Sequence, residues 1–270
     1  MATAVYLLVV GILLYFYVFI LFKIVIPEYI NVGIRSFIID FVFFSVLFLL
    51  PVVFAWWLGL RHDFFTYTHY PIRFNRKTRM VHAFQHNGPG GVVSVPWEQA
   101  FFFIGEGAHQ KYIRDLRCHV LDGDTVKETF VVGHYFDDTQ IKRIKALWEF
   151  IRRYMDEGAD KVMSNPLDHY VDTSVDETWT NCYVHVAASL GPTLYSIRYL
   201  LFPVYGMLTL TRWLVFKSSK VPEWPPEIEA ESVIEPDDPN RWPEPKFSGE
   251  FVNDPERDAR LLERMKQFDK

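Results

Sequence analysis

The 270 residues carry a formal net charge of −5 at pH 7, and 50% of them are hydrophobic. These figures average a very apolar N-terminal quarter and a polar remainder, so the whole-chain charge identifies no partner, and no nucleic-acid partner is expected. The length allows one domain of ordinary size besides the apolar segments and a tail. The two cysteines, Cys118 and Cys182, fit a compartment that keeps thiols reduced, with a disulfide or a two-cysteine metal site as the alternative.

Two long apolar runs at the N-terminus predict a transmembrane α-helical hairpin over residues 1–60. The first extends from Ala4 to Ile26 and contains one charge, Lys23, near enough to its end for the amine to reach the lipid headgroups. The second extends from Phe37 to Gly59, with Asp40 near its start and two tryptophans near its end, where membrane proteins place aromatic side chains. Both runs must be helices, because backbone groups in lipid find partners only within their own helix.

The charges that flank the hairpin predict its orientation. The loop from Pro27 to Ser36 holds only Glu28 and Arg35, whereas the stretch after the second run is rich in cations. Cytoplasmic flanks carry the excess of lysine and arginine, so both termini are expected in the cytoplasm. The alternative is a cleaved signal peptide, but the first run is too long and lacks a basic start and a small-residue cleavage site. The cations are Arg61, Arg73, Arg76, Lys77 and Arg79.

Residues 61–160 are expected to form a β-rich domain. Five runs of β-branched and aromatic residues are separated by turn-forming clusters, which is typical of an antiparallel meander. Pro96 cannot donate to a strand ladder, so the third run is expected to be two short strands or a bulged edge strand. The runs extend over Phe64 to Asn75, Arg79 to His86, Val92 to Ile104, Tyr112 to Leu121 and Thr125 to Phe136.

An amphipathic helix is predicted from Thr139 to Glu157. Asp137 and Asp138 fit an N-cap, Gly158 fits a C-cap, and the apolar residues recur on one face, which must bury against the sheet. Strands followed by one closing helix predict an α+β cytoplasmic domain with an antiparallel, pleckstrin-homology-like sheet. The other face of the helix is basic, and it is either solvated or attracted to an anionic membrane surface.

Residues 161–220 are expected to be a helical, membrane-interfacial segment. A loop from Ser164 to Asp176 precedes a helix from Glu177 to Leu190, which stops at a Gly-Pro pair. The segment from Thr193 to Phe216 is apolar, but two arginines leave only about 13 uncharged residues, or about 20 Å of helix, against a bilayer core of about 30 Å. An interfacial or re-entrant helix is favoured, and a third membrane span is the alternative.

Residues 221–270 are expected to be an acidic, proline-rich tail that is extended rather than helical. The tail contains Trp224 and Trp242, which a purely disordered segment would rarely contain, so parts of it are expected to lie across the folded domain. Its end, from Pro255 to Phe268, has apolar residues at helical spacing and predicts a short terminal helix.

Residues that suggest chemistry are few. His82 and His86 have the spacing of a helical zinc pair, but on a predicted strand they are about 13 Å apart and cannot hold one ion. Ser94 has no partner near it in the sequence. We therefore expect no catalytic, cofactor or metal site and no enzyme activity. The basic and aromatic end of the apolar segment and the two tail tryptophans are the candidate contacts with a membrane or a partner; they are Arg212, Trp213, Lys217, Lys220, Trp224 and Trp242.

Three stretches of the chain carry a family resemblance. They are Tyr70 to Thr78, Ser94 to Glu98, and the region from Arg212 to Pro239. They resemble an uncharacterised family of inner-membrane proteins of Gram-negative bacteria that are often encoded beside type VI secretion or Rhs-type toxin genes. The resemblance implies a bacterial inner-membrane location and a role as toxin partner, immunity protein or accessory factor, and it carries over no catalytic residue.

These features together indicate a two-pass, membrane-anchored binding protein that faces the cytoplasm. Its expected partners are the lipid bilayer and a protein, which the resemblance suggests is a secreted effector. Two alternatives stay open. One is a membrane-associated enzyme that acts on a lipid or envelope precursor, and the other is a structural or sensory membrane module.

Overall fold

The computed structural model of the protein describes residues 2–27, 33–107, 112–162, 173–238, 240–250 and 254–268. Contacts divide the chain into two compact units, each made of two separate segments. Unit 1 comprises Met1–Thr68 and Val175–Lys220, and unit 2 comprises His69–Ser174 and Val221–Lys270. Unit 1 thus joins the hairpin to most of the predicted helical segment 161–220. Unit 2 joins the β-rich domain to the tail.

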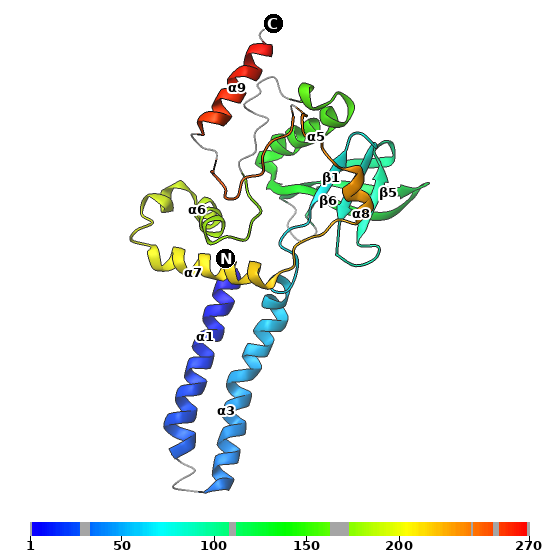
Figure 1. The fold of residues 1–270 in the computed structure, drawn as a ribbon. Helices are drawn as coiled ribbons and strands as arrows, with labels where there is room; N and C mark the ends of the chain where they lie inside the picture. Colours follow the sequence, from blue (N-terminus) through cyan, green and yellow to red (C-terminus); the bar gives the residue numbers. More distant parts are fainter. Residues whose placement is uncertain are drawn as a thin grey trace. The chain divides into compact units, whose positions relative to one another are not determined.

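Two long apolar helices form the hairpin of unit 1 (Figure 1). Helix α1, Ala2–Ile20, continues into the π-helical turn η1, Leu21–Val25. Helix α3, Ile34–Ala55, continues through the π-helical turn η2, Trp56–Leu60, into the short α4, Arg61–Asp63. The segments Thr3–Val25 and Phe37–Asp63 are long and apolar enough to cross a membrane. The two predicted apolar helices are confirmed, while Glu28 of the connecting loop lies outside the described residues.

Side chains of α1 and α3 contact each other, while many of their large apolar side chains are exposed. Tyr17 Oη and Ser45 Oγ are 2.9 Å apart. A Cβ on Gly59 would lie 2.6 Å from the Tyr6 ring, so the glycine permits the close approach of the two helices at this point. Exposed valine, leucine, isoleucine and phenylalanine side chains cover the rest of both helices, as expected for helices surrounded by lipid.

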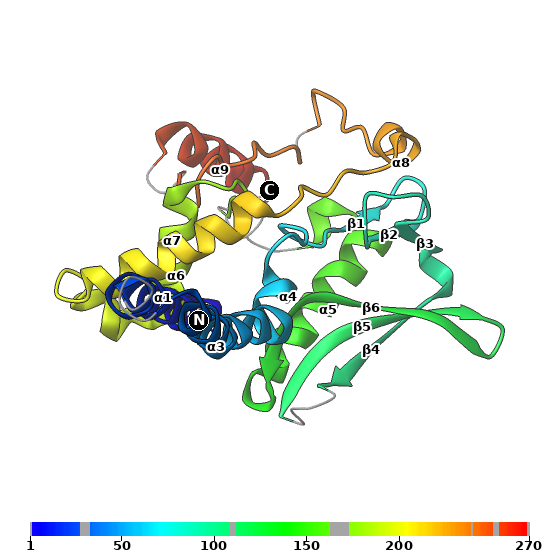
Figure 2. The same ribbon diagram turned by 90° about the horizontal axis from the view of Figure 1, so that it is seen from below.

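Helices α6, Trp179–Ser196, and α7, Phe202–Ser218, complete unit 1. The predicted helix end lies at a break inside α6, because Gly191 has a φ of 78° and interrupts the helical backbone before one more turn. Helix α7 has 17 residues, about 26 Å of helix, and is not among the described segments long enough to span a membrane. It contacts α6 and α1 and runs crosswise to the hairpin at the end where α1 begins (Figure 1 and Figure 2).

The described strands of unit 2 form two separate three-stranded antiparallel sheets. Strands β1, Ile72–Asn75, β2, Met80–Phe84, and β3, Val92–Pro96, form the first sheet in this order. Strands β4, Ala100–Glu106, β5, Ile113–Asp122, and β6, Thr125–Asp137, form the second.

The sheet arrangement corrects two predictions. The third predicted run is divided, as Pro96 indicated, but the 3₁₀ turn η3, Trp97–Gln99, separates two sheets instead of joining strands of one, so the prediction of one antiparallel sheet was wrong. The first predicted run was too long, because β1 begins only after Pro71 and Phe65 has a φ of 61°, outside the range of strands.

Helix α5, Ile141–Asp156, follows β6 through the 3₁₀ turn η4, Asp138–Gln140. Asp137 caps this turn by accepting a hydrogen bond from the Thr139 N–H at 2.9 Å. Gly158, with a φ of 102°, ends the helix by donating to the Arg153 carbonyl at 3.1 Å, and the 3₁₀ turn η5, Ala159–Lys161, follows. The predicted helix and its end at Gly158 are confirmed, whereas the predicted aspartate N-cap belongs to η4, because Gln140 precedes α5 and makes no capping hydrogen bond through its side chain.

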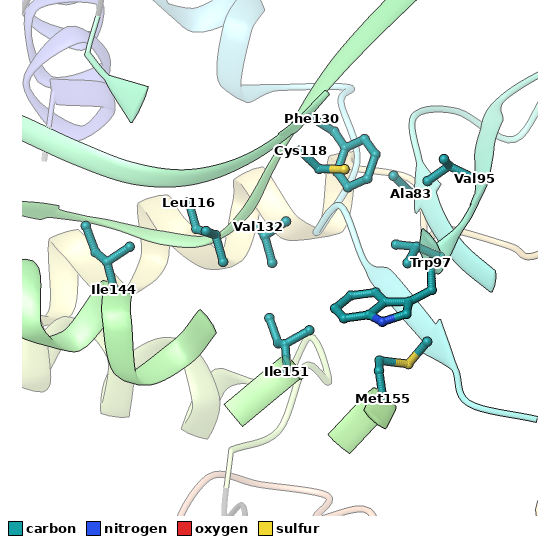
Figure 3. Packing of buried hydrophobic residues seen from close by; sticks show 11 residues of the cluster. Ala83, Val95, Trp97, Leu116, Cys118, Phe130, Val132, Ile144, Ile151 and Met155 are labelled. Carbon is teal, nitrogen blue, oxygen red and sulfur yellow. The ribbon is translucent and has the colours of Figure 1, made fainter. Parts of the chain in front are cut away.

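The core of unit 2 lies among the two sheets and α5 (Figure 3). The apolar face of α5 contributes three buried residues, and strands of both sheets and η3 contribute the others, so this face of the helix is buried as predicted. Dispersion and the removal of apolar surface from water hold these elements together. The buried cluster consists of Val81, Ala83, Val95, Trp97, Leu116, Cys118, Phe130, Val132, Ile144, Ile151 and Met155.

The tail contains two helices in its described part. Helix α9, Pro255–Phe268, confirms the predicted terminal helix. Helix α8, Pro226–Glu231, corrects the prediction that the proline-rich part is extended throughout. Pro226 has the backbone angle that a first helical turn needs, and Glu227 and Glu229 place negative charge at the positive end of the helix dipole.

Candidate functional site

Three polar residues form a cross-strand row on the first sheet of unit 2. Arg73 on β1 is opposite His82 on β2, and His82 is opposite Ser94 on β3. Residues that are opposite each other in an antiparallel pair project to the same face of the sheet. His82 Nδ1 and Ser94 Oγ are 2.8 Å apart, so at least this pair is hydrogen-bonded.

The first part of the tail is docked at Arg73. The Arg73 Nη1 donates to Glu229 Oε2 at 2.8 Å, and the Arg73 guanidinium lies 4.6 Å from the centre of the Trp224 ring. The same ring packs edge-on against Phe84, with 6.1 Å between the ring centres. One arginine therefore binds the tail through both an ion pair and a cation–π contact.

Glu231 makes the next contacts between the tail and the first sheet, at His82 and Asn75. Its Oε1 lies 2.9 Å from His82 Nε2, and its backbone carbonyl accepts from Asn75 Nδ2 at 2.9 Å. Only 3% of His82 is exposed. Burial lowers the pKa of His82 more than the Glu231 carboxylate raises it, and the nearby Arg73 lowers it further. The neutral imidazole is therefore the form that the folded protein favours.

Ser94, His82 and Glu231 are the residue types of a hydrolase triad, and the partner of Ser94 comes from the neighbouring strand, 12 positions away in the sequence. The serine and the histidine come together because the turn after β2 sets the strand register. In a triad the carboxylate holds the imidazole through an aligned hydrogen bond. Here His82 Nε2 is 2.9 Å from the carboxylate yet makes no hydrogen bond of good geometry with any described residue. The arrangement suits a tail-docking contact better than a catalytic one.

An open pocket of about 820 Å³ borders this docking site. Its walls come from the β1–β2 turn, the end of α5, and the tail after α8. Arg79 is fixed at one wall, since its Nε donates to Glu98 at 2.7 Å and its Nη1 donates to the Met155 carbonyl at 2.6 Å. The charged lining residues are of both signs and comprise Arg73, Arg76, Lys77, Arg79, Asp156, Glu157, Asp160, Glu231 and Asp238.

The second tail tryptophan, Trp242, is held by α9. Arg260 and Arg264 place their guanidinium groups 5.5 Å and 5.4 Å from the centre of its ring. Arg264 also donates to Asn240 Oδ1 at 2.7 Å. Trp224 thus contacts the β-rich domain, as the prediction that parts of the tail lie across it requires, whereas Trp242 contacts the terminal helix of the tail itself.

The other four predicted contact residues lie in unit 1, so the six do not form one site. The Arg212 guanidinium is 4.5 Å from the Phe216 ring centre, and the Trp213 ring packs against Trp179 with 6.4 Å between centres. Lys217 is exposed near the end of α7. The final residue of the set, Lys220, follows α7 and pairs its backbone with the chain after α4 through an isolated parallel bridge to Tyr67.

Neither cysteine offers a reactive thiol. Cys118 and Cys182 are both buried and free, so the disulfide alternative is not realised. Burial raises the pKa of Cys118 to about 12 and raises the pKa of Cys182 as well. Within the described ranges, no three His, Cys, Asp or Glu side chains are grouped so that they would hold a metal ion.

Residues 48–236 match the model of DUF6708, a family of unknown function. The chain belongs to this family. The DUF6708 region begins within α3 and ends after α8, so it includes both sheets, α5 to α7 and the docked part of the tail. It leaves out α1, Trp242 and α9. Comparisons with curated proteins and with solved structures find no match.

Proposed function

We propose that this DUF6708 protein is a two-pass, membrane-anchored binding protein, with unit 2 and both chain ends on the cytoplasmic side. Two helices with the length and composition of membrane spans support the anchoring. The orientation rests on the five basic residues between 61 and 79. More specifically, we propose that the membrane is a bacterial inner membrane and that the protein is an immunity or accessory partner of a secreted toxin. Both of these points rest on the family resemblance.

The interfacial placement of residues 193–216 belongs to the same proposal. Helix α7 runs crosswise to the two candidate spans, which is the direction of a helix that lies in the membrane surface (Figure 2). Its exposed side includes Met207, Leu210 and Leu214 at helical spacing, and Lys217 follows on the same side. This apolar stripe supports an interfacial helix over a third span.

The open pocket of unit 2 is the observation that carries the binding proposal. Its volume of about 820 Å³ is within the range of ligand-binding sites. Its lining differs from most small-molecule sites, because those are mostly apolar and this one has charged side chains of both signs. Such a lining complements a polar protein segment better than an apolar metabolite. The position of α5 after the strands also supports a distant pleckstrin-homology-like relationship, which stays a proposal.

Partner retention tests the proposal. The full chain is solubilised in detergent from membranes, and copurifying proteins are compared for the parent, Arg76→Glu and a variant lacking residues 221–270. Arg76 is an exposed pocket residue, whereas Lys127 is an exposed residue outside the pocket, so Lys127→Glu is the matched control. We expect Arg76→Glu and the deletion, but not Lys127→Glu, to lose the partner. Retention of one partner by all four proteins would reject the pocket as its binding site.

A membrane-associated hydrolase acting on a lipid or envelope precursor is the second candidate, favoured by the 2.8 Å contact between Ser94 and His82. A fluorophosphonate probe labels activated serines and tests it. We expect the parent and Ser94→Ala to be equally unlabelled. Labelling of the parent that disappears in Ser94→Ala, with membrane insertion and partner binding unchanged, would make the enzyme the better interpretation.

A further inference from the structure

A second pocket, of about 210 Å³, lies within unit 1. Thr3 and Asp63 line it, and these are the first residue of one candidate span and the last residue of the other. The remaining walls come from α6 and α7, including His185, Ser189 and Arg212. Because both span ends meet at this pocket, its depth in a bilayer corresponds to the lipid headgroup region.

Arg212 is a partly buried cation in this pocket. Its Nε is buried and has no hydrogen-bond partner among the described residues. Its guanidinium stacks 4.5 Å from the centre of the Phe216 ring, which also lines the pocket. Burial lowers the pKa of Arg212, and the group that raises it in opposition is Cys182, not a carboxylate. A partly buried guanidinium whose buried Nε has no partner among the described residues favours an anionic ligand with oxygen acceptors, such as a phosphate.

The same pocket contains a carboxylate. Asp63 accepts a hydrogen bond from Thr3 Oγ1 through one of its oxygens, Oδ2. The hydroxyl groups of two other lining residues are used within their own helices, since Ser189 donates to the His185 carbonyl and Thr211 donates to the Met207 carbonyl. The principal charged groups of the lining are therefore one guanidinium and one carboxylate, which match a ligand that carries both a phosphate and an ammonium group.

We propose that this pocket binds the headgroup of a zwitterionic phospholipid with a primary amine, with the phosphate on Arg212 and the ammonium on Asp63. The proposal rests on the membrane anchoring proposed above. A phosphoethanolamine group has about eight non-hydrogen atoms, and the pocket holds on the order of seven water-sized groups at about 30 Å³ each. A primary ammonium donates hydrogen bonds to a carboxylate, whereas a trimethylammonium group has no N–H to donate. A purely anionic headgroup would satisfy Arg212 but place negative charge near Asp63.

Native mass spectrometry of the full chain, released from nanodiscs, tests the inference. The nanodiscs contain phosphatidylcholine with an equal fraction of either phosphatidylethanolamine or phosphatidylglycerol. We expect one phosphatidylethanolamine to be retained in preference to the other two lipids. Arg212→Gln should weaken its retention roughly tenfold or more, because a charge-assisted contact is lost. Asp63→Asn should reduce the preference for phosphatidylethanolamine over phosphatidylglycerol, and the amide oxygen of this variant still offers an acceptor to Thr3.

The control is Arg198→Gln, because Arg198 is a cation of the same unit that does not line the pocket. It should leave the lipid preference unchanged. Equal retention of the three lipids, or a preference unaffected by Arg212→Gln, would overturn the inference. Displacement of the lipid by millimolar inorganic phosphate or free phosphoethanolamine would also overturn it, since the ligand would then be a soluble anion. A chain that sediments with membranes but shows no preference refutes only this pocket, whereas a chain that fails to sediment refutes the anchoring.

Discussion

The guanidinium of Arg73 lies over the indole ring of Trp224, with 4.6 Å between its Cζ and the ring centre. The two residues are 151 positions apart in the sequence, and the same arginine also holds Glu229 on α8. Arg73 on β1 is thus one of the side chains that position the tail on the first sheet, together with Asn75 and His82. The tail-docking contacts belong to the region that defines the family, because both Trp224 and Glu229 lie within the matched residues.

Removal of the Arg73–Trp224 contact should release the tail. We expect Trp224→Ala to weaken docking by about 1 to 2 kcal/mol, because the cation–π contact and the buried ring surface are lost together. Cleavage in the segment after Val221 should then be roughly tenfold faster in limited proteolysis of the full chain. Lys127→Gln, which removes an exposed ion pair with Asp122 elsewhere in unit 2, is the control and should leave the cleavage rate unchanged.

Truncation of Trp148 on α5 should destabilise unit 2. Its ring lies 4.8 Å from the Phe102 ring centre and 5.8 Å from that of Trp97, so α5 is joined to residues of η3 and β4. We expect Trp148→Ala to cost about 3 kcal/mol, the lower part of the usual range for aromatic truncation, because the ring is only partly buried. Thermal unfolding of the full chain in detergent measures this, with exposed Lys145→Ala as control. An unchanged midpoint would mean that α5 contributes little to the core.

Stability should fall on mild acidification because of His82. Its folded-state pKa is below the ordinary value of about 6.5, so between the two values the unfolded chain binds more protons than the folded one. The contribution of His82 to the free energy of unfolding is therefore fully present above about pH 6.5 and is lost as the pH falls towards the lowered pKa. The groups that face the imidazole are Arg73, Ser94 and Glu231.

Unfolding midpoints of the full chain between pH 8 and pH 5 would measure this effect. His82→Gln should flatten the pH dependence, whereas His134→Gln, at an exposed position on β6, should not. The prediction fails if the two variants follow the parent with the same slope.

The hairpin orientation predicts the activity of alkaline phosphatase fusions. The enzyme folds only outside the cytoplasm, so a fusion after Glu106 should be inactive and a fusion within residues 27–36 should be active. The reason is the excess of arginine and lysine after the second span. The reverse pattern would place unit 2 on the opposite side of the membrane.

Features that depend on neighbouring residues were predictable from the sequence. The apolar helices follow from run length, the cap of η4 from Asp137, the end of α5 from Gly158, and the bounds of α9 from helical spacing. Pro96 correctly indicated a division of the third β run. In each case the decisive interaction lies within a few residues, where propensity and periodicity determine the outcome.

Features that depend on distant segments were not predictable. The separation of the strands into two sheets depends on which strands pair, and no local signal specifies that pairing. The contact between Ser94 and His82 depends on register across a loop, and the docking of Glu229 and Glu231 depends on residues more than 140 positions away. The acidic pattern after Trp224 and the basic pattern around Arg73 were both visible, but complementary charge alone does not identify a partner.

The way in which the two units share the chain determines the order in which they can be completed during synthesis. The chain after Thr68 leaves unit 1 for unit 2, returns to unit 1 at Val175, and enters unit 2 again at Val221. The ribosome therefore releases α1, α3, both sheets and α5 before it has made α6 and α7. A nascent chain that stops at Ser174 has two incomplete units and no finished one. A stalled or truncated product thus exposes incomplete surface on both units, and quality-control proteases can attack it at either one.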